Sequence, residues 1–181
     1  HYEDYKAGSA KLDACMELVH GALGGGHHIL LFSQFTGMLD IIGKRLAKED
    51  IGFLKLTGAS SKESRAKMVA QFQAGEVPVF LISLKAGGVG LNLTAADVVI
   101  HYDPWWNVAA QDQATDRAHR IGQQHTVTVY KLIAKDTIEE RIMQMQESKR
   151  DLVNSVLGGD GISSALFTRE DVLALLGGDG R

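Results

Sequence analysis

The strongest chemical signal in the sequence is a glycine-rich segment that runs from Ser83 to Leu93, directly after the apolar run 79–82. Glycines allow backbone N–H groups to approach an anion, and the segment adds the Ser83 hydroxyl and the Lys85 ammonium. Such a loop is suited to binding phosphate groups. It has neither the Walker A spacing nor the full dinucleotide-binding glycine pattern, so a tight connection without a ligand is the alternative.

A predicted helix over about residues 108–121, which we call the arginine helix, carries the second signal. One face of it, about 100° wide, holds four polar side chains: Gln113, Asp116, Arg117 and Arg120. Two guanidinium groups held rigidly on one face are suited to clamping a phosphate. The competing interpretation is an intrahelical pair of Asp116 with Arg120, worth only about 0.3–0.5 kcal/mol.

Two adjacent tryptophans, Trp105 and Trp106, stand between the apolar run 98–101 and the arginine helix. Neighbouring side chains point in different directions in regular structure, so we expect at least one ring to face a ligand, a partner or another segment. The alternative is that Trp105 belongs to the core.

Short apolar runs without alternation predict strands that are buried on both faces, as in a parallel sheet. Two such runs lie at residues 79–82 and 98–101, and further strands are predicted at 29–32, 53–56 and 127–133. Because helical patterns alternate with them, the sequence predicts an α/β fold with a largely parallel sheet and helices on both faces. Ligands of such folds bind at the carboxyl ends of the strands.

Three helices are predicted in the first half of the chain. Apolar spacing predicts two of them, over about residues 12–23 and 39–46. A capping box of Ser60 and Glu63 predicts the start of the third. The buried side of this third helix is expected to hold Ala66, Val69 and Phe72.

A long helix is predicted over about residues 137–157, with apolar residues at roughly heptad spacing. We expect it either to brace the sheet or to reach another domain or protein partner. Glycines at 158–161 predict a flexible joint, followed by a short helix that ends at Leu176. The expected domains are therefore one lobe with its brace helix over residues 1–157 and an appendage over residues 158–181.

The composition fits one globular domain with a real core: 181 residues, 45% hydrophobic and 23% charged. A net charge of −3 is not that of a strongly basic nucleic-acid binder, so any such contact must be local. Basic residues gather between Lys44 and Lys67, although a solvated helix face is the alternative.

The single cysteine and the histidine spacing predict no disulfide framework and no metal site. Without a signal segment or a membrane-spanning run, we expect a bacterial cytoplasmic or a nuclear protein without membrane contact.

Four segments, taken in order, resemble the motifs of the second motor lobe of SWI/SNF-related helicase-like ATPases of superfamily two. Residues 29–35 resemble motif IV, 56–65 the next motif, 83–93 motif V and 112–123 motif VI. The resemblance covers about residues 9–157, most of the chain.

The resemblance implies a recA-like fold and a division of labour between two lobes. In the family, a first lobe holds Mg²⁺ and ATP, and the second lobe closes over the nucleotide. By this analogy Arg117 and Arg120 reach the triphosphate, Arg120 as the arginine finger. Gln113, Gly88 and Gly90 would lie against the nucleotide. Since the first-lobe motifs are not in this sequence, the segment alone is expected to be inactive, with the N-terminal recA-like lobe of the same protein as its partner.

The resemblance also implies binding of double-stranded DNA through backbone phosphates, without sequence reading. The residues at the matching positions are Ser33, Gln34, Thr57, Gly58, Ser83, Lys85, Gly87 and Trp106. Closure and opening over ATP cycles would then move the protein along DNA. Two positions depart from the family pattern: Val108 stands where a proline is usual, and Lys85 where arginine is common.

Two other functions stay open at this point. One is a strand-separating helicase lobe that acts on DNA or RNA. The other is a non-enzymatic interaction module that docks partners through helix 137–157 and the acidic end of the chain, which the arginine pair makes less attractive.

Overall fold

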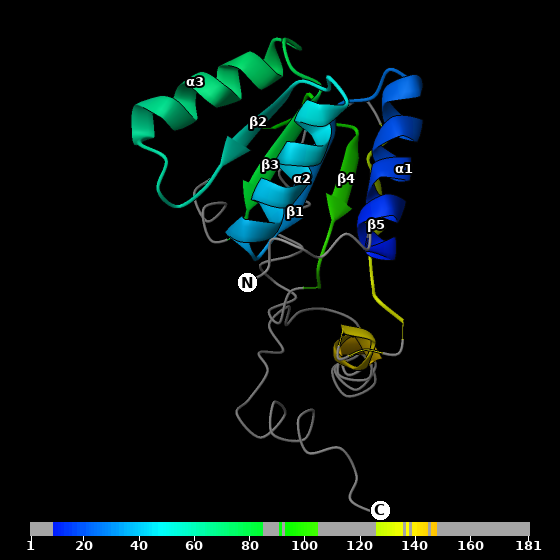
Figure 1. Cartoon of the computed structure of the whole chain (residues 1–181). Helices are drawn as coiled ribbons and strands as arrows, with labels where there is room; N and C mark the ends of the chain where they lie inside the picture. Colours follow the sequence, from blue (N-terminus) through cyan, green and yellow to red (C-terminus); the bar gives the residue numbers. More distant parts are fainter. Residues whose placement is uncertain are drawn as a thin grey trace, which may run out of the picture.

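The computed structural model describes residues 9–84, 91, 93–104, 126–135, 137, 139–144 and 146–147. Five strands in these residues form one sheet in the order β2-β3-β1-β4-β5, and every neighbouring pair is parallel (Figure 1). The strands are β1 (Ile29–Ser33), β2 (Phe53–Leu56), β3 (Val79–Ser83), β4 (Val98–His101) and β5 (Thr128–Lys131). The predicted α/β fold with a parallel sheet is confirmed.

Three helices connect or precede these strands: α1 (Ala10–Gly24), α2 (Thr36–Lys48) and α3 (Lys62–Gln73). Residues 139–144 and 146–147 are also helical and belong to the predicted brace helix. The arginine helix and the segment 158–181 lie outside the described residues. None of the helices described is both long enough and apolar enough to cross a membrane.

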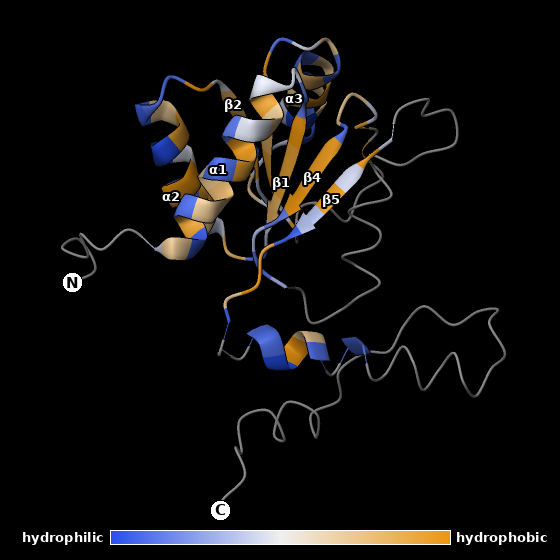
Figure 2. Cartoon of the chain, turned by 90° about the vertical axis from the view of Figure 1, so that its right-hand side faces the viewer, coloured by the Kyte–Doolittle hydropathy of each residue, from blue (hydrophilic) through white to orange (hydrophobic). Residues whose placement is uncertain are grey.

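Helices cover both faces of the sheet, as Figure 2 shows. Alternate residues of β1 point to opposite faces: Leu31 joins the core under α1 and α2, whereas Leu30 joins the core under α3. Phe72 anchors α3 to this second core, where its ring centroid lies 5.4 Å from that of Phe80. Since β1, β3 and β4 are buried on both faces, their sequences are continuous apolar runs.

The predicted capping box at the start of α3 is wrong by one residue. The N-cap is Ser61, whose side chain accepts a hydrogen bond from Ser64 N at 3.2 Å. The Ser60 hydroxyl instead accepts one from Thr57 N at 3.2 Å, in the turn that precedes the helix. Ser60 is thus committed to the turn, and its neighbour takes the capping position.

The predicted buried side of α3 is wrong at one position. Phe72 is buried and Val69 packs beside it, but Ala66 is exposed. Met68 occupies the remaining place in the contact with the sheet. The helix therefore meets the sheet mainly through its second half.

Candidate functional site

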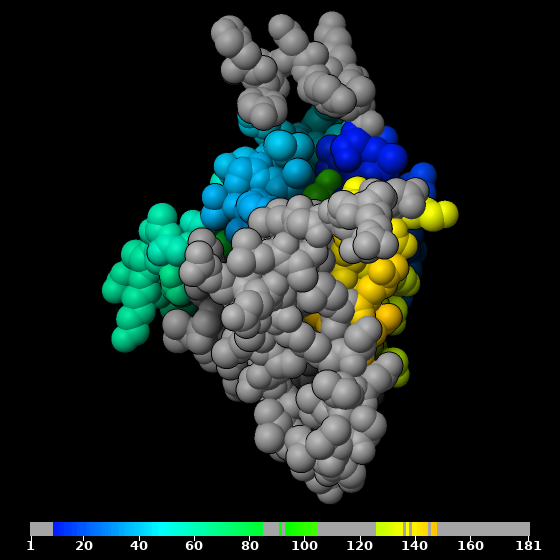
Figure 3. Space-filling view, turned by 90° about the horizontal axis from the view of Figure 1, so that it is seen from below, coloured from blue at the N-terminus to red at the C-terminus, as the bar shows by residue number. Residues whose placement is uncertain are grey.

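The carboxyl ends of β1, β3 and β4 meet at one edge of the sheet, because the strands are parallel and adjacent. Ser33 and Ser83 are paired in register at the ends of β1 and β3, and their exposed fractions are 0% and 1%. Leu84 N donates to Ser33 O at 3.1 Å, which carries the pairing one residue beyond β3. Figure 3 views the molecule from this edge, with α3 to one side and α2 next to α1.

The carboxylate of Asp103 organises this edge. It accepts a hydrogen bond from the Ser33 hydroxyl, and its other oxygen accepts one from Gln34 N at 2.9 Å. The side-chain amide of Gln34 donates to Pro104 O at 3.2 Å. Burial raises the pKa of Asp103, while the bonds from Ser33 and Gln34 act in the opposite direction. The loops that follow β1 and β4 are therefore joined by side chains as well as by the sheet.

The Ser33 hydroxyl is a shared partner in this network. It also accepts a hydrogen bond from Phe35 N at 3.1 Å. The Phe35 ring is 59% exposed at the start of α2. Beside the buried Ser33, Gln34 is half-exposed and Phe35 is exposed.

A turn after β2 lies one strand beyond β3 along the same edge. Arg65 of α3 folds over it and donates from Nε to Ser60 O at 3.0 Å and from Nη2 to Thr57 O at 3.4 Å. Thr57 is half-buried and Gly58 is exposed. The structure thus brings Thr57 and Gly58 to the edge at which Ser33, Gln34 and Ser83 lie.

Gln73, at the end of α3, fixes the chain where it returns from the glycine-rich segment. Its amide oxygen accepts a hydrogen bond from Ala95 N at 2.8 Å, and its amide nitrogen donates to Thr94 Oγ1 at 3.0 Å. Leu93 and Ala96, on either side, are buried in the core under α3. Both ends of the glycine-rich segment are therefore fixed, at Ser83 by the sheet and at Thr94 by Gln73.

Sequence reasoning gave no role to Asp103 or Gln73. An acid two residues after a buried strand is a usable signal for Asp103, because that position lies at the ligand edge of a parallel sheet. Nothing in the local sequence distinguishes Gln73 from the other polar residues of α3.

Eight predicted site residues lie outside the described part of the chain: Lys85, Gly87, Gly88, Gly90, Trp106, Gln113, Arg117 and Arg120. Their segments leave the sheet at Leu84 and Pro104, after strands that lie on either side of β1. Among the residues described, no group of three or more acidic, histidine or cysteine side chains could hold a metal ion.

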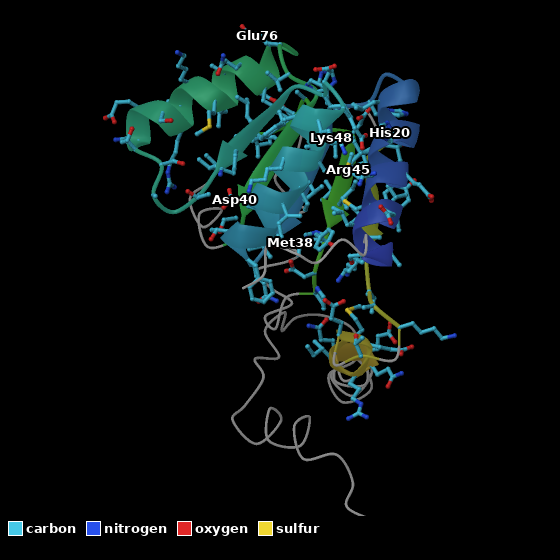
Figure 4. All side chains as sticks on the ribbon, in the orientation of Figure 1. His20, Met38, Asp40, Arg45, Lys48 and Glu76 are labelled. Atoms are coloured by element: carbon cyan, nitrogen blue, oxygen red, sulfur yellow. The ribbon has the colours of Figure 1, made fainter. Side chains whose placement is uncertain are left out.

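An ion-pair network links α1 to α2 at a distance from this edge. Glu49 pairs with His20 Nε2 at 2.7 Å and with Arg45 Nε at 2.5 Å. Figure 4 shows His20 and Arg45 between the two helices, whereas Met38 lies at the end of α2 nearest the strand ends. The network is exposed or half-exposed, so we assign it to the surface joint between the helices.

His101, the last residue of β4, is buried, and its ring is stacked on that of Phe32 at a centroid distance of 5.4 Å. Burial, together with the charge of Lys131, lowers the pKa of His101 from 6.5 to about 4. In the unfolded chain the same ring takes up a proton near its ordinary value. The unfolded state therefore binds more protons between these two values, and stability is lost as the pH falls through them.

Lowering the pH from about 7 to about 4.5 is expected to lower the free energy of unfolding through His101 by about 2–3 kcal/mol. Urea unfolding of the wild type and of His101→Gln at both pH values measures this difference. The raised pKa of Asp103 acts with the opposite sign but is present in both proteins, so it cancels. Equal pH dependence in the two proteins would exclude His101 as its source.

The chain is similar to proteins of one family over most of its length. The family described as "Helicase conserved C-terminal domain" matches residues 10–122. An "Uncharacterized ATP-dependent helicase" of Mycoplasma pneumoniae is 46% identical over 168 residues, which are 92% of this chain and 16% of that protein. The human "Chromatin-remodeling ATPase INO80" is 42% identical over 169 residues, which are 93% of this chain and 11% of that protein. The chain thus spans less than a fifth of the curated relatives it matches.

Two solved structures share the fold. The C-terminal part of the Fun30 ATPase domain superposes with a TM-score of 0.73 and 40% identity, over 76% of this chain and 45% of that one. The SWI2/SNF2 ATPase core of Sulfolobus solfataricus, solved in complex with double-stranded DNA, gives a TM-score of 0.69 and 40% identity. That alignment covers 82% of this chain and 31% of the other.

Proposed function

The chain belongs to the helicase conserved C-terminal domain family, among the SNF2-related ATPases, and on that premise we propose that it is the second motor lobe of an ATP-dependent double-stranded DNA translocase. The observation that carries the proposal is the convergence of β1, β3 and β4 at one edge. The segment that resembles motif IV contains β1 and ends two residues beyond it. The segment that resembles motif V begins at the last residue of β3, and the segment that leads to motif VI follows β4.

In this proposal the arginine helix supplies the groups that meet ATP. Arg120 acts as the arginine finger and Arg117 assists it, while Gln113, Gly88 and Gly90 lie against the nucleotide. By analogy with the family, Mg²⁺ is assigned to the first lobe, whose motifs do not occur in this sequence. Residues 158–181 are proposed to be a jointed appendage.

DNA binding is proposed to use the edge built by the strand ends. Gln34, Thr57 and Gly58 are the exposed or half-exposed members of the predicted set that the structure describes. Ser33 and Ser83 are buried, so we assign them to the support of these contacts. Lys85, Gly87 and Trp106 complete the proposed contacts to the phosphate backbone.

The full-length protein tests the proposal through its ATPase rate with and without duplex DNA. We expect stimulation by duplex DNA and displacement of a third strand from an intact triplex. An ATPase rate that duplex DNA does not change would contradict the motor function. A protein without ATPase activity would favour the interaction module. Separation of a forked duplex without triplex displacement would favour a strand-separating helicase.

Lys85→Ala is expected to weaken DNA binding by the full-length protein and to make it less sensitive to salt. One lost phosphate contact should lower the slope of log K against log salt concentration by about 0.9. Anisotropy titrations over a salt series measure this slope. Lys48→Ala is the matched control, because Lys48 lies farther along α2 from the strand ends than Met38 does (Figure 4). An unchanged slope in Lys85→Ala would exclude the phosphate contact.

A further inference from the structure

Two aspartates flank β4, and each binds the backbone of a residue that flanks β1. Asp97 Oδ1 accepts a hydrogen bond from His28 N at 3.0 Å, and Asp103 Oδ1 accepts one from Gln34 N at 2.9 Å. Each bond joins residues 69 positions apart. The pairing of β1 with β4 is therefore closed at both ends by a carboxylate.

The two carboxylates differ in their surroundings. Asp97 is half-buried, and its second oxygen pairs with His27 Nδ1 at 2.6 Å at the amino ends of the strands. Asp103 lies at the carboxyl ends of the strands and is 3% exposed. Its second oxygen accepts a hydrogen bond from the Ser33 hydroxyl. Burying a carboxylate costs free energy. Asp97 closes the strand pair at a lower cost because it is only half-buried, so closure alone does not account for the burial of Asp103.

The network around Asp103 fixes a short stretch of backbone. The Ser33 hydroxyl donates a hydrogen bond to Asp103 and accepts one from Phe35 N. Asp103 also accepts a hydrogen bond from Gln34 N. The Gln34 side chain in turn reaches Pro104 O. The loop after β1 is consequently hydrogen-bonded to the chain that leaves β4 at two successive residues, Asp103 and Pro104.

Resting on the proposed function, we propose that Asp103 is a positioning residue that holds Gln34, in the loop after β1, in the orientation in which it binds DNA. The chain runs from Asp103 through Pro104 directly into Trp105 and Trp106. Asp103 acts through Ser33 and Gln34 and does not itself touch DNA.

Asp103→Ala in the full-length protein tests this role through the ATPase rate as a function of duplex DNA concentration. We expect the DNA concentration for half-maximal stimulation to rise about tenfold, because Gln34 N loses the charge-assisted hydrogen bond that orients the loop, and one such bond corresponds to about a factor of ten. The KM for ATP should stay within about twofold, because the nucleotide contacts lie elsewhere. Asp103→Asn keeps one oxygen for Gln34 N and is expected to fall between the wild type and Asp103→Ala.

Asp97→Ala is the matched control, since it removes the same kind of bond between the same two strands at the opposite edge. Its DNA response should stay within about twofold of the wild type. An equal loss of DNA response in Asp97→Ala and Asp103→Ala would overturn the positioning role, because a general loosening of the strand pair would explain both. A KM for ATP that rises in proportion to the DNA effect in Asp103→Ala would overturn it as well.

Amide hydrogen exchange of the same full-length proteins gives a readout that does not depend on DNA. Asp103→Ala should speed exchange of the Gln34 and Phe35 amides about tenfold or more, while Asp97→Ala should speed exchange at His28 instead. Unchanged exchange at Gln34 in Asp103→Ala would overturn the role of Asp103. If duplex DNA fails to stimulate the wild type, the proposed motor function fails, while the exchange result still decides whether Asp103 positions the loop.

Discussion

Arg120→Ala in the full-length protein is expected to lower ATP turnover about 10³-fold or more, while binding to duplex DNA persists. The reason is that an arginine finger stabilises the charge that develops on the transferring phosphoryl group, and effects of this size follow its loss. The measurement is kcat for the DNA-stimulated ATPase, together with the Kd for a duplex oligonucleotide.

Arg45→Ala provides the control for Arg120→Ala. Arg45 is a partly exposed arginine of α2 whose partners are Glu49 and Asp13, so its removal should leave turnover close to that of the wild type. Turnover within a few-fold of normal in Arg120→Ala would remove Arg120 from the finger role. A loss of DNA binding as large as the loss of turnover would instead assign Arg120 to the DNA contact.

Phe72→Ala is expected to lower the free energy of unfolding of the chain by about 3–5 kcal/mol. Phe72 is the fully buried side chain of α3. Its ring packs against Phe80 and lies nearly perpendicular to the His28 ring, at a centroid distance of 6.0 Å. Its truncation leaves a cavity between α3 and the sheet. Urea unfolding of the 181-residue chain measures the change.

Ala66→Ser is the matched control on the same helix, because Ala66 is exposed. It should change the free energy of unfolding by no more than about 0.5 kcal/mol. A loss below about 1 kcal/mol in Phe72→Ala would show that α3 is held by other contacts. Since Gln73 follows Phe72 directly, the same variant is expected to loosen the hold of α3 on Thr94 and Ala95.

Three of the strands, β1, β3 and β4, could be predicted because burial on both faces leaves a clear mark on a sequence, whereas β2 is only partly buried. The apolar run at 53–56 coincides with β2, and the runs at 29–32 and 79–82 fall one residue short of β1 and β3. The missing residue in both cases is a serine, Ser33 or Ser83, whose polarity ends the run although its backbone continues the ladder. The run at 127–133 overestimates β5, which is exposed along its length.

Local chemistry alone did not separate neighbouring residues of the same type. Ser60 and Ser61 are equally good caps in sequence, and the choice depends on the turn that Arg65 covers. In the same way, an aspartate after a strand is visible in the sequence, but its partners Ser33 and Gln34 are about 70 residues away. Such contacts follow from the strand order, which no short motif encodes.

The central place of β1 has a consequence for how the chain is made. Among the five strands of this sheet it is synthesised first, yet its partners, β3 and β4, follow only after β2. On the ribosome the backbone N–H and C=O groups along both of its edges therefore stay unpaired until Val79–Ser83 and Val98–His101 emerge. Pairings this far apart in sequence form slowly, because loop-closure entropy opposes them until they are made. The nascent lobe consequently passes through an interval of aggregation risk that ends only when its fourth strand leaves the exit tunnel.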